Sequence, residues 1–225
     1  MKTYYNLYAI AMVLVLTFTS CPSNYTPDEQ SGEIPTAERV DDIFVINTNE
    51  FGQEYYIFRT NDEKYWKPEG MTIWTVFEQV DEPFTSRTVT MAKPVGYSSE
   101  GGGYGIVFCH GEYEIDGKIE PVMLVVMINN NEQYIVGKTI GGVFHDYGWW
   151  KKTTHLKQGA GTKNKVTVNR ESDGEFHIII NDNFVDSFRD NEFPQLSGGK
   201  NGYIVVITPF DSFPSPGIDV YFEEE

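Results

Sequence analysis

Three carboxylates lie close together in the segment EYEIDGKIE, at Glu114, Asp116 and Glu120. Two carboxylates that face one cleft about 5.5 Å apart can act as nucleophile and acid/base in the retaining hydrolysis of glycosidic bonds. Alternate residues of one strand would supply such a pair. Asp116 precedes Gly117, however, and Asp-Gly is a strong signal for a two-residue hairpin turn. We therefore expect Glu120 on the next strand, and we favour an exposed acidic hairpin over a catalytic pair.

A second segment, HDYGWWKKTTH, carries the candidate ligand-binding aromatics Tyr147, Trp149 and Trp150. Tryptophan and tyrosine combine a flat apolar face with a polar group, and this suits the C–H faces and hydroxyls of sugar rings. Adjacent residues of an extended chain face opposite ways, so we expect one tryptophan in the core and the other exposed. Ligand contact by at least one of the three is the functional interpretation, and packing into the core and its rim is the alternative.

The remaining motifs offer little chemistry. The four histidines show no metal-ligand spacing such as H-E-x-x-H, so we expect no structural zinc. The run GGGYG at 101–105 lacks a following helix and a Lys-Ser/Thr pair, which excludes a phosphate-binding loop. We expect these glycines to give flexibility ahead of a strand. Cys109 lies in an apolar run and is predicted to be a buried, inert thiol.

Composition excludes one large class of partner. The 225-residue chain has a formal net charge of −16, from 33 acidic and 17 basic side chains. So acidic a protein repels phosphate backbones, and we exclude nucleic-acid binding. Hydrophobic residues make up 40% of the chain and aromatic residues 15%, which allows a sizeable core. The two cysteines are too few for a disulfide framework.

The N-terminus is typical of a secretory signal. Lys2 precedes an apolar stretch that ends at Phe18. This stretch is shorter than the roughly 20 residues of a spanning helix and fits the apolar part of a signal peptide. The residues that follow, Thr-Ser-Cys, resemble the lipobox of bacterial lipoproteins, in which the cysteine receives the lipid; here it is Cys21. Phe18 departs from the leucine usual in that motif, and an ordinary secretory signal is the alternative.

These features divide the chain into three parts. Residues 1–20 are predicted to be a lipoprotein signal peptide, and residues 21–41 a lipidated, disordered tether, because that segment is polar and contains prolines. Residues 42–225 are predicted to be one folded domain. The expected location is the bacterial cell envelope, with the domain outside the cytoplasm and lipid-anchored to a membrane.

Strand signals predominate in the folded part. Short runs rich in β-branched and aromatic residues are separated by turn residues, and no run shows helical spacing. In HIIINDNFVDSF, apolar residues precede and follow a turn that we place at Asp182-Asn183, because both residue types tolerate left-handed backbone. The run from Val122 to Ile128 is apolar on both faces, which is typical of a central strand that is covered on each side. Many short strands with such turns indicate an all-β sandwich.

The order of these segments resembles the concanavalin-A-like jelly-roll domains, above all the laminin-G-like and 3-keto-disaccharide-hydrolase-like groups. The resemblance covers roughly residues 50 to 225. Its matching elements are GYGIVF, the Gly-Thr-Lys-Asn element at 161–164, the hairpin at 181–185, and the strands at 202–207 and 218–222. The resemblance implies a jelly-roll β-sandwich of two antiparallel sheets. These are structural residues and not a catalytic signature, so they bear on the fold rather than the function.

The resemblance also implies a candidate calcium site, because laminin-G-like domains often bind calcium through loop oxygens. The candidate ligands would be Asp182, Asp190, Asp211 and the asparagines at 129–131. None of them has the spacing of an EF-hand loop, and solvated turns explain the same residues. We predict no cofactor, with calcium as the alternative.

Three functions are compatible with this sequence. The favoured one is a non-catalytic, membrane-anchored β-sandwich that binds a glycan or a host or envelope protein. The second is a hydrolase acting on sugars, which the resemblance to the keto-disaccharide-hydrolase group implies. The third is a structural envelope lipoprotein with no small ligand.

Overall fold

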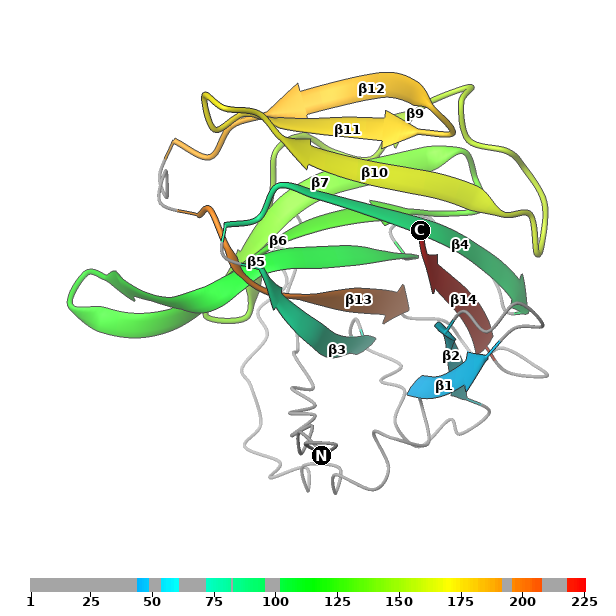
Figure 1. The fold of residues 1–225 in the computed structure, drawn as a ribbon, viewed down its shortest axis with the longest axis horizontal. Coiled ribbons are helices and arrows are strands. Elements are labelled where there is room, and N and C mark those ends of the chain that lie inside the picture. The colour runs from blue at the N-terminus through cyan, green and yellow to red at the C-terminus, as the bar shows by residue number, and fades with distance from the viewer. Residues whose placement is uncertain are drawn as a thin grey trace, which may run out of the picture.

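The computed structural model describes residues 44–48, 54–60, 72–81, 83–95, 102–191, 196–207 and 218–225. These residues form fourteen strands, paired antiparallel in two sheets, and include no helix. The two sheets stack face to face (Figure 1). The predicted fold class, an all-β sandwich of two antiparallel sheets, is confirmed. The predicted signal peptide and the tether lie outside the described residues, and no helix of the described part is long and apolar enough to cross a membrane.

Each sheet has seven strands. In spatial order, the first sheet contains β1 (Phe44–Thr48), β2 (Glu54–Thr60), β14 (Ile218–Glu224), β4 (Ser86–Val95), β10 (Asn164–Arg170), β11 (Phe176–Ile180) and β12 (Asn183–Phe188). The second contains β3 (Thr72–Asp81), β13 (Gly199–Ile207), β5 (Gly103–Ile115), β6 (Lys118–Ile128), β7 (Gln133–Ile140) and β8 (Val143–Asp146), with β9 (Lys151–Lys152) also paired to β7. The sequence did not reveal β1, β8 and β9, which are short.

The main core lies between the sheets and follows the period of two that strands impose. Val166 and Val168 of β10 are fully buried while their neighbours are half-exposed, and β11 buries Phe176, Ile178 and Ile180 in the same way. These side chains meet the inward residues of β5, β6 and β13. The alternation predicted from the sequence is therefore confirmed.

The second sheet is apolar on its outer face as well. Buried side chains there come from four strands: Val107, Met123, Val125, Met127, Ile135, Ile204 and Val206. Trp150 packs with them, and the partly buried ring of Phe144 joins the same cluster. The prediction that the Val122 to Ile128 run belongs to a strand covered on both sides is confirmed.

The hairpin between β11 and β12 turns one residue earlier than the sequence suggested. Ile180 pairs with Asn183, which leaves Asn181 and Asp182 as the two turn residues, with φ of 49° and 66°. A two-residue turn of this kind needs positive φ at both positions, and asparagine and aspartate tolerate it. The Asn181 side chain fixes the turn, because its amide donates to the backbone carbonyl oxygen of His155 at 2.7 Å and to the side-chain Oδ1 atom of Asn164 at 2.8 Å.

A bulge interrupts the pairing of β5 at Cys109, which has φ of 53°. The backbone N–H of Cys109 donates to the Oδ1 atom of Asn201, whose side chain is fully buried in β13. This bond satisfies an N–H group that the bulge removes from the ladder. The Cys109 side chain is buried, as predicted, and it forms no disulfide with a described residue.

The glycines expected to give flexibility lie instead in packed backbone. Gly103 and Gly105 belong to β5. A Cβ atom on Gly103 would lie 2.6 Å from the Trp150 ring, and one on Gly105 would lie 1.9 Å from the carbonyl oxygen of Val126. These positions require glycine because there is no space for a side chain.

Lys93 of β4 is a buried cation, with 6% of its surface exposed. The same strand contributes Val89 and Met91 to the core, and Ala92 beside Lys93 is buried as well. Burial lowers the pKa of the Lys93 ammonium to about 8, from an ordinary value of 10.5. Below pH 8 the folded chain therefore holds a charge in surroundings that disfavour it.

We expect Lys93→Met to raise the free energy of unfolding at pH 7 by an amount on the order of 3 kcal/mol at most. Between pH 8 and 10.5 the unfolded chain binds a proton at Lys93 that the folded chain does not. Wild-type stability therefore gains from this group as pH rises, and the advantage of the variant should shrink. Urea unfolding of both chains at pH 7, 9 and 10.5 measures this difference. A constant difference across these pH values would contradict the prediction.

Candidate functional site

The three hairpin carboxylates do not face one cleft. The register pairs Tyr113 with Glu120 and Glu114 with Ile119, so Glu114 and Glu120 point to opposite faces of the β5–β6 hairpin. Asp116 lies in the turn itself, with φ of 51°. The hairpin extends away from the body of the sandwich (Figure 1). This arrangement is the acidic exposed hairpin, and it provides no pair of converging carboxylates.

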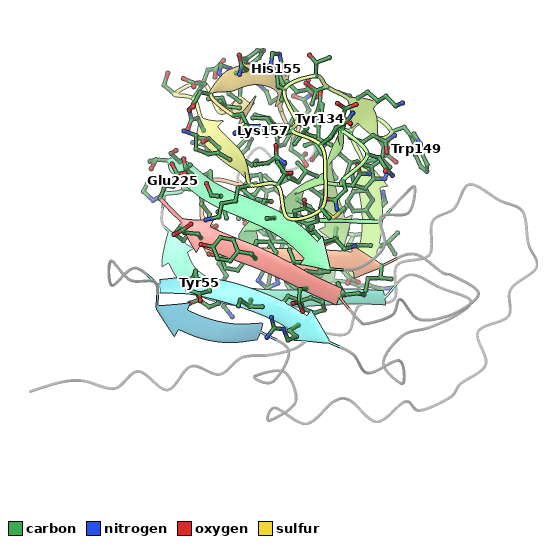
Figure 2. The ribbon with its side chains drawn as sticks, turned by 90° about the vertical axis from the view of Figure 1, so that its right-hand side faces the viewer. Tyr55, Tyr134, Trp149, His155, Lys157 and Glu225 are labelled. Carbon is green, nitrogen blue, oxygen red and sulfur yellow. The ribbon has the colours of Figure 1, made fainter. Side chains whose placement is uncertain are left out.

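The aromatic segment divides into packing residues and one exposed ring. Trp150 is 8% exposed and lies over Gly103, whereas 58% of Trp149 is exposed. Figure 2 shows the Trp149 side chain at the periphery of the molecule, pointing away from the strands. Tyr147 is half-buried, and its ring stacks on Phe188 at 5.0 Å. The expectation that one tryptophan packs and the other is exposed is confirmed, and Trp149 remains the candidate for a ligand contact.

The aromatic segment also packs against the outer face of the second sheet. Its buried side chains are aliphatic, and Trp150 and Phe144 lie across it. Phe144 fills the space above Gly137, where a Cβ atom would lie 2.4 Å from the ring. The segment from 144 to 150 therefore covers part of this face.

A pocket of about 310 Å³ opens at one end of the first sheet. Figure 1 shows this end on the left, where β10 ends, β11 begins and β12 ends. The lining combines two guanidinium groups, two carboxylates, small polar groups and apolar side chains: Arg170, Ser172, Asp173, Gly174, Phe176, Arg189, Asp190, Asn191 and Leu196. Its volume lies at the lower end of the range of small-ligand sites.

A chain of packed aromatic rings makes this pocket rigid. Phe176, a lining residue, stacks on Phe188 at 5.1 Å and contacts Phe108 at 5.5 Å. Phe84 and Tyr147 extend the chain at either end. Such aromatic pairs stabilise beyond the area they bury, so the wall behind the pocket is fixed before any ligand arrives.

A buried ion pair holds the two sheets together beside the pocket. The Lys138 ammonium of β7 donates to Oδ2 of Asp190 at 3.0 Å, and both side chains are almost fully buried. The Tyr147 hydroxyl donates to the same oxygen. Asp190 also lines the pocket. Its carboxylate is therefore already bound to a cation and a hydroxyl of the protein.

The two arginines of the pocket have different surroundings. Arg189 pairs with Asp173 at 2.5 Å on the exposed rim. The backbone N–H of Glu175 and the Arg189 guanidinium hold the pKa of Asp173 below its ordinary value, so this carboxylate is ionised at neutral pH. Arg170 lies over the Phe176 ring, with its guanidinium carbon 5.9 Å from the ring centroid. Within the described residues Arg170 forms no ion pair, and its buried Nε atom has no hydrogen-bond acceptor.

Most of the candidate calcium ligands already form hydrogen bonds or ion pairs within the protein. Asn129 accepts hydrogen bonds from the backbone N–H groups of Asn131 and Gln133. Asp190 binds Lys138, and the exposed Asp182 pairs with Lys165. Asp211 lies outside the described residues. The part of the chain that the structure describes contains no group of three or more His, Cys, Asp or Glu side chains placed to hold a metal ion.

The sequence interpretation missed Arg170 and Arg189, although a signal for them exists. Arg170 is the last residue of β10 and Arg189 directly follows β12, and these two strands flank β11 in one antiparallel meander. Two strands antiparallel to the same neighbour run in the same direction, so their ends meet at one edge of the sheet. The hairpin prediction alone thus brings the two arginines to one end.

No protein family and no curated protein matches this sequence. Solved structures do resemble it in fold. The carbohydrate-binding module CBM66 from Bacillus subtilis aligns over 80% of this chain and 89% of its own, with 13% identity and a TM-score of 0.46. The β-glucanase of Bacillus licheniformis aligns over 80% and 79%, with 7% identity and a TM-score of 0.49. The family 7 alginate lyase A1-II′ aligns over 80% of each chain, with 14% identity and a TM-score of 0.43.

Proposed function

We propose that this chain is a non-catalytic binding module whose β-sandwich takes a glycan in the pocket lined by Arg170, Phe176 and Arg189. The observation that carries the proposal is this pocket, because it places guanidinium groups, a hydroxyl and an amide above a rigid aromatic wall. Polar groups that converge beside an apolar wall can fix the orientation of a small ligand. The divergence of Glu114 and Glu120 argues against the hydrolase alternative, since these were its best candidates.

The proposal includes a location. Cys21 would carry the lipid, and residues 21–41 would hold the sandwich away from the membrane, outside the cytoplasm of a bacterium. The support for this is the signal-like N-terminus and its Thr-Ser-Cys motif. Incorporation of labelled palmitate into the wild-type chain, and its absence in Cys21→Ala, would support the anchor. Equal labelling of the two chains would overturn it.

A bulky side chain at the pocket rim tests the binding proposal. Asn191 is exposed and lines the pocket, so we expect Asn191→Trp to fill the opening without disturbing the core. The full-length chain, purified in mild detergent, is screened on an oligosaccharide array, and hits are titrated by calorimetry. We expect the variant to bind such hits at least tenfold more weakly, about 1.4 kcal/mol.

Trp149→Ala is the matched comparison, since it removes the exposed ring and leaves the pocket lining intact. A tenfold loss in this variant with none in Asn191→Trp would move the binding site to Trp149 and its neighbours. Failure of every oligosaccharide to bind would overturn glycan binding and favour a protein ligand or a purely structural envelope protein.

A further inference from the structure

We propose that the ligand of this pocket is an acidic sugar, and that Arg170 binds its carboxylate. This inference rests on the glycan-binding function proposed above. It specifies which class of glycan fits the pocket and which residue selects it.

The first argument is the charge that Arg170 leaves uncompensated. Acidic side chains outnumber basic ones by 33 to 17 in this chain, and cations of the described residues are commonly paired with them. Pairs of this kind involve Arg59, Arg87, Lys138, Lys151, Lys163, Lys165 and Arg189. Arg170 is half-buried and has no such partner in the described part of the chain. A partly desolvated charge without a counter-ion is unfavourable, so an anion that enters the pocket is stabilised there.

The second argument is how the charges of the lining are paired. Arg170 and Arg189 contribute two positive charges to it, and Asp173 and Asp190 contribute two negative ones. Asp173 is paired with Arg189, and Asp190 is paired with Lys138 of β7. Arg170 is therefore the lining cation whose charge no carboxylate of the lining pairs with, and a ligand carboxylate can take that place.

The third argument is geometric. The planar guanidinium of Arg170 lies over Phe176, and its Nη2 atom is 3.5 Å from the position of a Cβ atom on Gly174. Glycine thus leaves the terminal nitrogens room at the pocket wall. Two parallel N–H groups of a guanidinium match the two oxygens of a carboxylate. The Ser172 hydroxyl and the Asn191 amide on the rim supply donors and acceptors for ring hydroxyls.

The test compares charged and neutral oligosaccharides of equal length. The full-length chain in mild detergent is titrated with oligouronates of galacturonate, glucuronate, mannuronate and guluronate, and with their methyl esters. We expect at least one oligouronate to bind at least tenfold more tightly than its ester. Arg170→Gln should abolish that preference, and Arg170→Lys should retain part of it, since lysine keeps the charge and loses the fork. Arg59→Gln, which removes an exposed arginine of β2, is the control and should bind as the wild type does.

Each outcome has one meaning. Equal binding of acids and esters with no effect of Arg170→Gln overturns the acidic-sugar inference and leaves glycan binding intact. Binding of sulfated oligosaccharides or inorganic sulfate through Arg170, without binding of uronates, also overturns it. No binding of any saccharide overturns both proposals. Because Arg170 donates no side-chain hydrogen bond within the described residues and its charge is unpaired there, we expect Arg170→Gln to unfold at or above the wild-type temperature, and a melting curve checks this.

Discussion

Replacement of Asp190 by asparagine is expected to lower the free energy of unfolding by about 3–5 kcal/mol. The Lys138 ammonium lies 3.0 Å from Oδ2 of Asp190, and 6% and 3% of the two side chains are exposed. Asparagine keeps the shape of the side chain and removes its charge, so the ammonium stays buried and loses its attraction to the Asp190 carboxylate. The Tyr147 hydroxyl loses its charged acceptor in the same change. Denaturant unfolding at neutral pH measures the loss.

Two further variants test whether the buried pair is the cause. Asp182→Asn makes the same chemical change in an ion pair whose carboxylate is 77% exposed, and it should cost less than about 1 kcal/mol. Adding Lys138→Met to Asp190→Asn removes the buried positive charge as well, and it should restore most of the lost stability. If the double variant were as unstable as Asp190→Asn alone, the loss would come from the pocket or from Tyr147 rather than from the ion pair.

The sequence predicts the structural features that depend on residues close together in the chain. Alternation in KVTVNR places Val166 and Val168 in the core, and the turn residues Asn181 and Asp182 mark the hairpin to within one residue. Both features follow from the period of two in a strand and from the backbone preferences of asparagine and aspartate. The two stacked antiparallel sheets follow from many repetitions of these local signals.

What the sequence does not predict depends on contacts between distant segments. Lys138 and Asp190 are 52 positions apart and lie on different layers, so neither residue indicates its partner. The run from Val122 to Ile128 predicts a covered outer face, but it does not predict that Trp150 and Phe144 help to cover it. For the same reason, the lack of an ion pair at Arg170 within the described residues becomes visible only when Asp173 and Asp190 are shown to have other partners.

The wall and the rim of the pocket therefore have separate roles. The Lys138–Asp190 pair and the aromatic chain from Phe84 to Tyr147 bind no ligand in our proposal; they fix the wall against which Arg170 lies. Residues on the rim, such as Asn191, are exposed and tolerant of change. We accordingly expect substitutions in the wall to change mainly the free energy of unfolding, and substitutions in the rim to change mainly the affinity for the ligand.

Gly105→Ala is expected to destabilise the fold by about 3 kcal/mol or more, at or above the upper end of the usual range for overpacking. A Cβ atom at this position would lie 1.9 Å from the carbonyl oxygen of Val126 and 2.7 Å from the Cα atom of Met127. Both are backbone atoms of β6, so no side-chain rotation can relieve the overlap. The two strands would have to separate where they pair in the centre of the second sheet.

A second glycine provides the comparison. Its backbone conformation favours glycine, but a side chain at its position would meet no other atom. Gly117 has φ of 78° and no atom within 4 Å of its Cβ position. Gly117→Asn should change the free energy of unfolding by no more than about 0.5 kcal/mol, since asparagine tolerates left-handed backbone at an exposed turn. Urea unfolding of the two variants separates the close approach of β5 to β6 from backbone strain. Equal stability of Gly105→Ala and the wild type would mean that β5 and β6 can move apart at no cost, and the tight pairing described here would be wrong.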